Sequence, residues 1–126
     1  MPTDDRSVLV VEDNDSLLQL LCRILGKYGF DVMTASDGSE ALITYQDHQN
    51  EIGVVITDLE MPEMDGMELQ DHLHRVTPDL PVVAVSAWAD TLKFGDELDR
   101  HFAAVLTKPF TTDVLVNNIR ELMQRK

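Results

Sequence analysis

Cysteine and cationic residues are scarce in this chain of 126 residues, and both shortages restrict what it can do. The single Cys22 rules out an internal disulfide bond, and its place in an apolar helical pattern indicates a buried, unreactive thiol. Only 10 lysine and arginine residues stand against 23 aspartate and glutamate residues, which gives a net charge of −13. Such a charge disfavours direct binding to nucleic acids or to anionic membranes.

Long apolar runs are missing as well. No stretch approaches the roughly 20 apolar residues that a membrane-spanning helix needs, and residues 1–7 lack the apolar centre of a signal peptide. We therefore expect a cytoplasmic protein with no membrane contact. The length fits one domain over residues 1–126, with a core of about residues 7–124 and no output domain.

Short apolar runs are present, and they alternate with helix-like segments along the whole chain. Strands are expected at Val8–Val11, Asp31–Ala35, Gly53–Thr57, Val82–Val85 and Ala103–Thr107. Helices are expected at Ser16–Lys27, Ser39–His48, Met67–Val76, within Ala89–His101 and at Thr111–Gln124. Five strand–helix units of this kind predict an α/β fold in which helices cover both faces of a parallel sheet.

The helix patterns also predict which side chains are buried. Leu21 and Tyr28 share the apolar face of the first helix, and Val76 lies on the buried stripe of the third. The segment from Ala89 to His101 is the least well specified, because Gly95 interrupts it at about 1 kcal/mol relative to alanine. We expect that helix to be the most mobile. The four histidines share no metal-ligand spacing and are expected at the surface.

Polar residues follow four of the predicted strands at the points where they end. Glu12 and Asp13 follow the first strand, Asp58 the third, Ser86 the fourth and Lys108 the fifth. Right-handed crossovers place the carboxyl ends of parallel strands at one edge of the sheet, where open α/β sheets bind their ligands. We therefore expect three carboxylates, one hydroxyl and one lysine to share a small pocket.

This set of groups indicates phosphoryl chemistry. Three neighbouring carboxylates repel one another unless protons or a cation compensate, and Mg²⁺ suits a site with oxygen ligands. Lys108 and Ser86 can then contact phosphoryl oxygens, which leaves the Asp58 carboxylate as the nucleophile. Phosphoryl transfer asks mainly for positioning and charge neutralisation.

Over nearly its whole length the chain resembles the receiver domain of two-component response regulators, of the chemotaxis-regulator type. The resemblance rests on Val10-Val11-Glu12-Asp13-Asn14, on Asp58 with Met61-Pro62 and Met64-Asp65-Gly66, on Ser86-Ala87 and on Lys108-Pro109-Phe110. It implies a flavodoxin-like, doubly wound sheet of order 2-1-3-4-5 in a three-layer α/β/α sandwich with five helices. It also implies a cis Lys108–Pro109 bond.

The resemblance further implies roles for individual residues. Asp58 accepts a phosphoryl group from a phosphohistidine on a sensor histidine kinase or phosphotransfer protein, while Lys108 and Ser86 contact that group. Mg²⁺ is bound by Glu12, Asp13, Asp58 and the backbone carbonyl of Glu60. The domain is then a signalling switch rather than an enzyme, and it acts on an output domain or on a partner in trans. We expect a monomer that associates weakly on phosphorylation.

Other residues at this edge are implied to tune the switch. Val105 stands where the family usually carries tyrosine or phenylalanine, so the usual coupling between the hydroxyl and an aromatic ring is in question. Ala87 belongs to the switch segment, and Trp88 and Glu60 occupy positions that tune dephosphorylation in the family. Because both side chains can hinder an attacking water molecule, we expect a phosphoryl lifetime of minutes or longer.

Three alternatives remain open on the residues alone. The first is an aspartyl-phosphate phosphatase, which needs an aspartate two residues after the nucleophile, where Glu60 stands. The second is a flavodoxin relative, whose phosphate-binding first loop would be repelled by Glu12 and Asp13. The third is a pseudo-receiver, which keeps the fold as an interaction module without phosphorylation. The sequence identifies neither the output nor the kinase, nor whether the domain stands alone or is part of a hybrid kinase.

Overall fold

The computed structural model describes residues 6–87 and 96–124 and contains one parallel sheet of order β2-β1-β3-β4-β5. Its strands are β1 (Ser7–Val11), β2 (Val32–Ala35), β3 (Ile52–Asp58), β4 (Val82–Ser86) and β5 (Ala104–Thr107). The described helices are α1 (Asp15–Lys27), α2 (Gly38–Asp47), α3 (Gly66–Val76), α5 (Asp96–His101) and α6 (Thr112–Gln124). The predicted fold class and strand order are confirmed.

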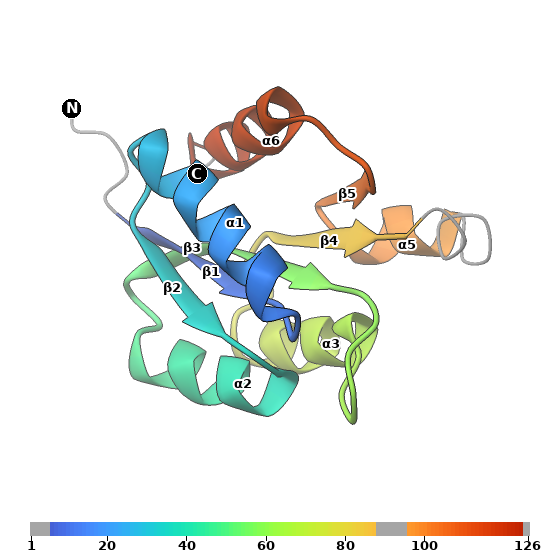
Figure 1. The fold of residues 1–126 in the computed structure, drawn as a ribbon. Helices are drawn as coiled ribbons and strands as arrows, with labels where there is room; N and C mark the ends of the chain where they lie inside the picture. The colour runs from blue at the N-terminus through green and yellow to red at the C-terminus, as the bar shows by residue number, and fades with distance from the viewer. Residues whose placement is uncertain (1–5, 88–95, 125–126) are drawn as a thin grey trace.

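Helices cover both faces of the sheet, as Figure 1 shows. Leu21 and Leu25 of α1 join Leu115 and Ile119 of α6 in one apolar core against the sheet. The other core contains side chains from α2, α3 and α5 on the opposite face. The β1 run from Val8 to Val11 is no more than 1% exposed because the strand is covered on both sides.

Side-chain caps begin several of the helices. The Asn14 side chain accepts a hydrogen bond from the Leu17 N–H at the start of α1, and Thr111 accepts one from the Val114 N–H before α6. Asp65 begins α3 with a reciprocal capping box. These caps fix where each loop at the strand ends gives way to a helix.

Two side chains that were predicted to be buried are exposed, and each lies at or just after the end of a helix. Tyr28 is 43% exposed because α1 ends at Lys27 and the Tyr28 backbone has left the helical repeat. Val76 is 45% exposed because it is the last residue of α3 and the next residue is extended. The four histidines, expected at the surface, are all partly buried, and His74 has Nε2 2.8 Å from the Leu80 carbonyl oxygen.

The predicted helix between Ala89 and His101 is described only over its second half. Leu98 and Phe102 are buried there in the core beneath α2 and α3. Residues 88–95, with Gly95 and Trp88, lie outside the described residues. Cys22 is half-buried, and burial raises the pKa of its thiol, which keeps it protonated at neutral pH.

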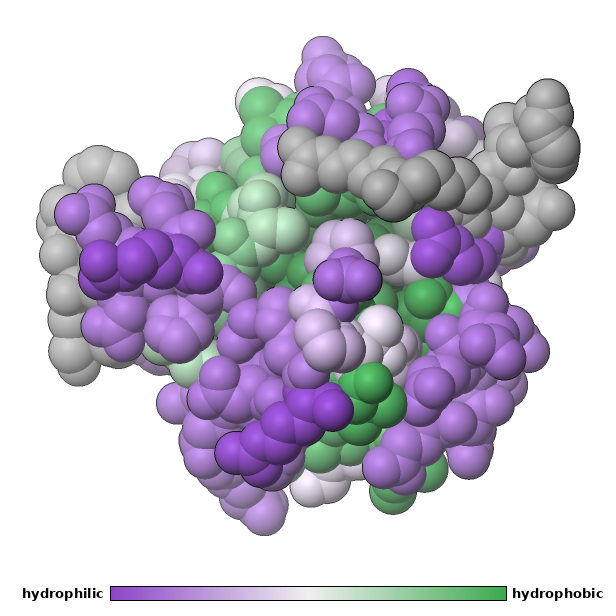
Figure 2. Space-filling model, turned by 180° about the vertical axis from the view of Figure 1, so that it is seen from behind, coloured by the Kyte–Doolittle hydropathy of each residue, from purple (hydrophilic) through white to green (hydrophobic). Residues whose placement is uncertain are grey.

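The described surface is largely polar. Hydrophilic residues dominate the face in Figure 2, with hydrophobic side chains visible between them. None of the described helices is long and apolar enough to span a bilayer.

Candidate functional site

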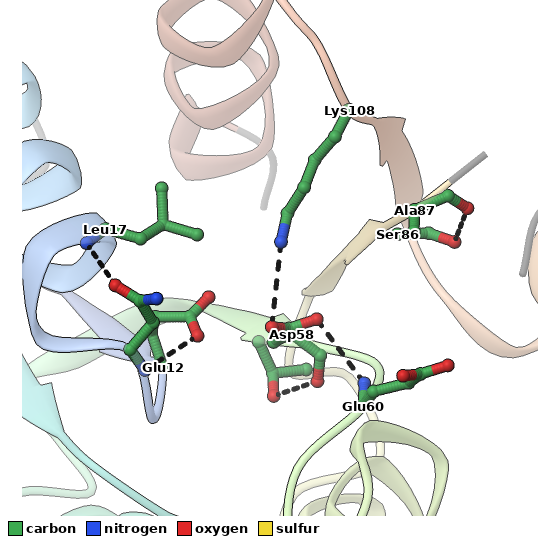
Figure 3. A network of polar contacts seen from close by, with 9 residues as sticks. Glu12, Leu17, Asp58, Glu60, Ser86, Ala87 and Lys108 are labelled. Carbon is green, nitrogen blue, oxygen red and sulfur yellow. Dashed lines mark hydrogen bonds and ion pairs between the residues drawn. The ribbon is translucent and has the colours of Figure 1, made fainter. Parts of the chain in front are cut away.

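The strand register brings the predicted site residues to one edge of the sheet. Val11 of β1 lies beside Thr57, the residue before Asp58, and Asp58 in turn lies beside Val85 of β4. The fourth and fifth strands end together, since Ser86 is paired with Thr107. Figure 3 shows the resulting arrangement, with Glu12 and Lys108 near Asp58 and Ser86 to one side.

Three carboxylates form the acidic part of the site. Carboxylate oxygens of Glu12, Asp13 and Asp58 all lie within 4.8 Å of one another. Glu12 is only 2% exposed, and its Oε2 accepts a hydrogen bond of 3.0 Å from the Asn14 N–H. Burial, with a smaller contribution from the Asp58 charge, raises the pKa of Glu12 to about 7, although the Asn14 N–H acts against the rise. The cluster therefore needs a cation or a proton near neutral pH.

Lys108 supplies the positive charge. Its Nζ lies 3.7 Å from Asp58 Oδ2, and Figure 3 shows the side chain extended from the end of β5 toward the carboxylate. The Lys108 N–H donates to the Ser86 carbonyl oxygen at 2.8 Å, which fixes the backbone from which the side chain extends. The Lys108–Pro109 bond is cis, as the resemblance implied.

Ser86 lies at the same edge but does not point toward Asp58. Its side chain is fully buried, and Oγ donates a hydrogen bond of 3.0 Å to the Ala87 carbonyl oxygen, away from Asp58 (Figure 3). Ala87 is exposed. Val105 is partly buried and packs against the core beneath α3 and α5. Trp88 lies outside the described residues.

The loop from Asp58 to α3 contains two features that the sequence reasoning missed. A Cβ atom on Gly66 would lie 2.5 Å from the Asp58 carbonyl oxygen, so only glycine lets α3 begin against this backbone. Glu63 has a φ of 68°, and the Met64 N–H donates to the Pro62 carbonyl oxygen at 2.8 Å across it. This is a γ-turn of the rare, strained kind. The Met64-Asp65-Gly66 sequence carried the signal for Gly66, whereas no signal marks Glu63.

The amide N–H of Glu60 lies 3.4 Å from Asp58 Oδ1, a long contact on the side of the carboxylate opposite Glu12. Thr57 is fully buried, and its hydroxyl donates to the Asp58 carbonyl oxygen at 2.9 Å. The backbone of Asp58 is thereby held from both sides, by Thr57 and by the close approach of Gly66. Asp58 is thus a partly exposed carboxylate on a fixed backbone, as a nucleophile requires.

Comparison with known proteins identifies the family. The model of the response regulator receiver domain matches residues 8–120. The chain belongs to this family. The sensor histidine kinase RcsC of Salmonella typhimurium is 35% identical over 122 residues, which are 97% of this chain and 13% of that protein. The chain thus spans only a small part of this relative.

Solved structures agree with this assignment. A receiver domain protein from Clostridium thermocellum has a TM-score of 0.89 and 29% identity, with 95% of each chain covered. The response regulator TrrA of Thermotoga maritima, solved in complex with Mg²⁺-BeF, has a TM-score of 0.82 and 26% identity. That match covers 93% of this receiver domain and 98% of TrrA. The receiver fold is therefore matched over almost its full length.

Proposed function

We propose that this receiver domain accepts a phosphoryl group on Asp58 from a phosphohistidine of a sensor histidine kinase or phosphotransfer protein. The observation that carries the proposal is the arrangement around the Asp58 carboxylate. Lys108 Nζ lies 3.7 Å from Oδ2, and carboxylate oxygens of Glu12 and Asp13 lie within 4.8 Å of an Asp58 oxygen. An anionic group transferred to Asp58 therefore meets one fixed cation and a place for a second.

The donor set fits Mg²⁺. The three carboxylates offer only hard oxygen ligands, and Glu12 is buried with a pKa raised by that burial to about 7. Glu12, Asp13, Asp58 and the Glu60 carbonyl would hold the ion. When bound, it would supply the positive charge that balances the acids and the phosphoryl oxygens.

The chain's own residues would do the rest of the transfer. An Asp58 carboxylate oxygen attacks phosphorus, the new O–P bond forms as the P–N bond breaks, and the leaving imidazole takes the electron pair. Lys108 holds the transferred oxygens by charge, and the buried Ser86 hydroxyl exchanges its bond to the Ala87 carbonyl oxygen for one to the phosphoryl group. The hydroxyl's present orientation is then that of the unphosphorylated state.

The proposed product is a signal rather than a released chemical. Movement at Ser86 would reach the helices through Val105, which packs on the core with Leu98 and Phe102 of the α5 region. An output domain or a partner protein in trans would read the change, and a weak dimer would form only on phosphorylation. The relatives include the sensor histidine kinase RcsC and the probable transcriptional regulator ycf27 of Cyanophora paradoxa, which is compatible with several outputs.

The fluorescence of the single Trp88, two residues after Ser86, provides the test. Titration with Mg²⁺ and then with beryllofluoride, a phosphoryl mimic, should give two saturable changes. Asp58→Asn should abolish the second change, whereas Asp71→Asn, a charge-matched change at an exposed position of α3, should preserve both. A folded wild-type protein that responds to neither reagent would instead be a pseudo-receiver that binds its partner without phosphate.

Dephosphorylation gives a second test. The backbone N–H of Glu60 lies 3.4 Å from Asp58 Oδ1, and the negative charge of this residue near the mouth of the site should repel an attacking hydroxide. After labelling with a small-molecule phosphodonor, the wild-type phosphoryl group should last minutes or longer, and Glu60→Gln should shorten that lifetime. A wild-type lifetime of seconds would contradict the role given to Glu60.

A further inference from the structure

The edge of the sheet opposite Asp58 contains a hollow of about 730 Å³. It opens where the strands begin, between Arg6 before β1, Val82 at the start of β4 and Ala103 before β5. The ends of α3, α5 and α6 complete its walls, and the arrows of β3 and β4 in Figure 1 point away from it. The volume lies within the range of small-molecule sites. The hollow is therefore separate from the phosphoryl site by the length of the sheet.

The charge of its described lining is opposite to that of the protein. Among the residues that the structure describes, Arg6 and Arg100 line the hollow beside the rings of His74 and His101, and Asp79 is the only carboxylate in that described lining. The whole chain has more than twice as many acids as lysines and arginines, at 23 against 10. A cationic hollow in such a chain locally reverses the field that would otherwise repel an anion.

Helix ends account for only part of this charge. The basic residues at the ends of α3 and α5 complement the negative ends of the helix dipoles. Arg6, however, precedes a strand and belongs to no helix. Arg100 is exposed, and among the residues that the structure describes it has no ion-pair partner, although Asp96 lies four positions earlier on the same helix. Its guanidinium group remains available to a ligand.

The wall beside these cations is rigid and partly apolar. The Nε2 of His74 donates to the Leu80 carbonyl oxygen at 2.8 Å, and its Nδ1 lies 3.0 Å from the Gln70 amide nitrogen, so the ring is held on both sides. Leu80 and Phe102 line the hollow with side chains of the core. The described lining therefore combines cationic side chains with the small exposed parts of fixed apolar side chains.

We propose that this hollow binds a small organic anion, one carboxylate or phosphate on an apolar body. Arg6 and Arg100 hold the charged group, and the wall of Leu80 and Phe102 receives the apolar part. The proposal does not depend on phosphorylation of Asp58, because the hollow and the acid cluster share no residue.

The probe is anilinonaphthalene sulfonate, an aromatic anion that fluoresces when its body leaves water. With the full chain it should bind at a single saturable site, and added salt should weaken the binding. The double variant Arg6→Gln and Arg100→Gln should weaken binding at least tenfold. The matched double variant Arg23→Gln and Lys27→Gln, which removes the same charge from the exposed side of α1, should change it little.

A variant in which a larger side chain fills the hollow keeps the test valid if removal of the arginine charges disturbs the fold. Ala103 is exposed at the mouth of the hollow, and Ala103→Trp should block the probe without changing any charge. Naphthoate should displace the probe from the wild type and so lower the probe fluorescence. In the Ala103→Trp variant, naphthoate should leave the probe fluorescence unchanged. Unsaturable binding, or equal binding by the wild type, the Arg6 and Arg100 variant and the blocked variant, would overturn the proposal.

Discussion

Replacing Glu12 by glutamine should change how the stability of the domain depends on pH. Glu12 is 2% exposed beside Asp13 and Asp58, and burial raises its pKa from 4.5 to about 7. Between these two values the native state keeps a proton that the unfolded state has lost. The free energy of unfolding contributed by Glu12 therefore falls as pH rises through this window, and it is level below and above it.

The size of the effect follows from the shift. The Glu12 pKa is 4.5 in the unfolded chain and about 7 in the folded domain. Once the pH is above the folded value, this difference lowers the unfolding free energy of the wild type by about 3 kcal/mol. Glu12→Gln carries no charge in either state, and its side-chain oxygen can still accept from the Asn14 N–H. Without metal, the variant should therefore gain stability relative to the wild type as pH rises, and Mg²⁺ should reverse the order.

Urea unfolding of both proteins in a chelating buffer, at a series of pH values from below 4.5 to above 7, measures this difference directly. Asp58→Asn is the second comparison. Removing the neighbouring charge should lower the pKa of Glu12, so the unfolding free energy of this variant should depend less on pH than that of the wild type. A difference between wild type and Glu12→Gln that stays constant with pH would refute the argument that Glu12 holds a proton in the metal-free native state.

Further substitutions test the backbone and the packing around the site. Glu63→Asn should stabilise the domain by about 0.5–1 kcal/mol in thermal unfolding, because asparagine tolerates the positive φ that strains glutamate; a loss of stability would contradict the strain. Gly66→Ala should destabilise it by more than about 2 kcal/mol, since the new Cβ would meet the Asp58 carbonyl oxygen at 2.5 Å. Gly26→Ala, with no atom within 4 Å of its Cβ and a place inside α1, is the control and should stabilise by about 0.5–1 kcal/mol. Tyr45→Phe should cost about 1 kcal/mol, because the buried hydroxyl donates to a threonine hydroxyl at 2.6 Å, and an unchanged urea midpoint would count against that bond.

The strand ends explain why most of the site could be predicted from the sequence. Apolar runs such as Val54-Val55-Ile56 mark buried strands, and in a parallel sheet the residues after each run must meet at one edge. Glu12, Asp58 and Lys108 were expected together on this basis, and their contacts in the structure agree. This inference needs only the direction of the strands, which the alternation with helices already indicates.

Features that depend on a single torsion or on a helix end could not be predicted in the same way. The direction of the Ser86 hydroxyl follows from one χ1 rotation, and no pattern in the chain records it. Tyr28 and Val76 continue the apolar repeat of their helices but lie where the helices end. Periodicity therefore predicted them to be buried, whereas both are exposed. The positive φ of Glu63 is likewise imposed by the loop, against the residue's own preference.

Several unfavourable features of the domain gather at the edge where Asp58 lies. Glu12 is a buried carboxyl group beside two other acids, and Glu63 holds a strained γ-turn in the loop that follows Asp58. Natural domains retain such features where a ligand or a modification compensates for them. A cation that binds the acids only in the native state should raise the unfolding free energy by an amount set by its concentration and its affinity. Metal-dependent stability that disappears in Glu12→Gln would therefore link the electrostatics of the cluster to the proposed phosphoryl switch.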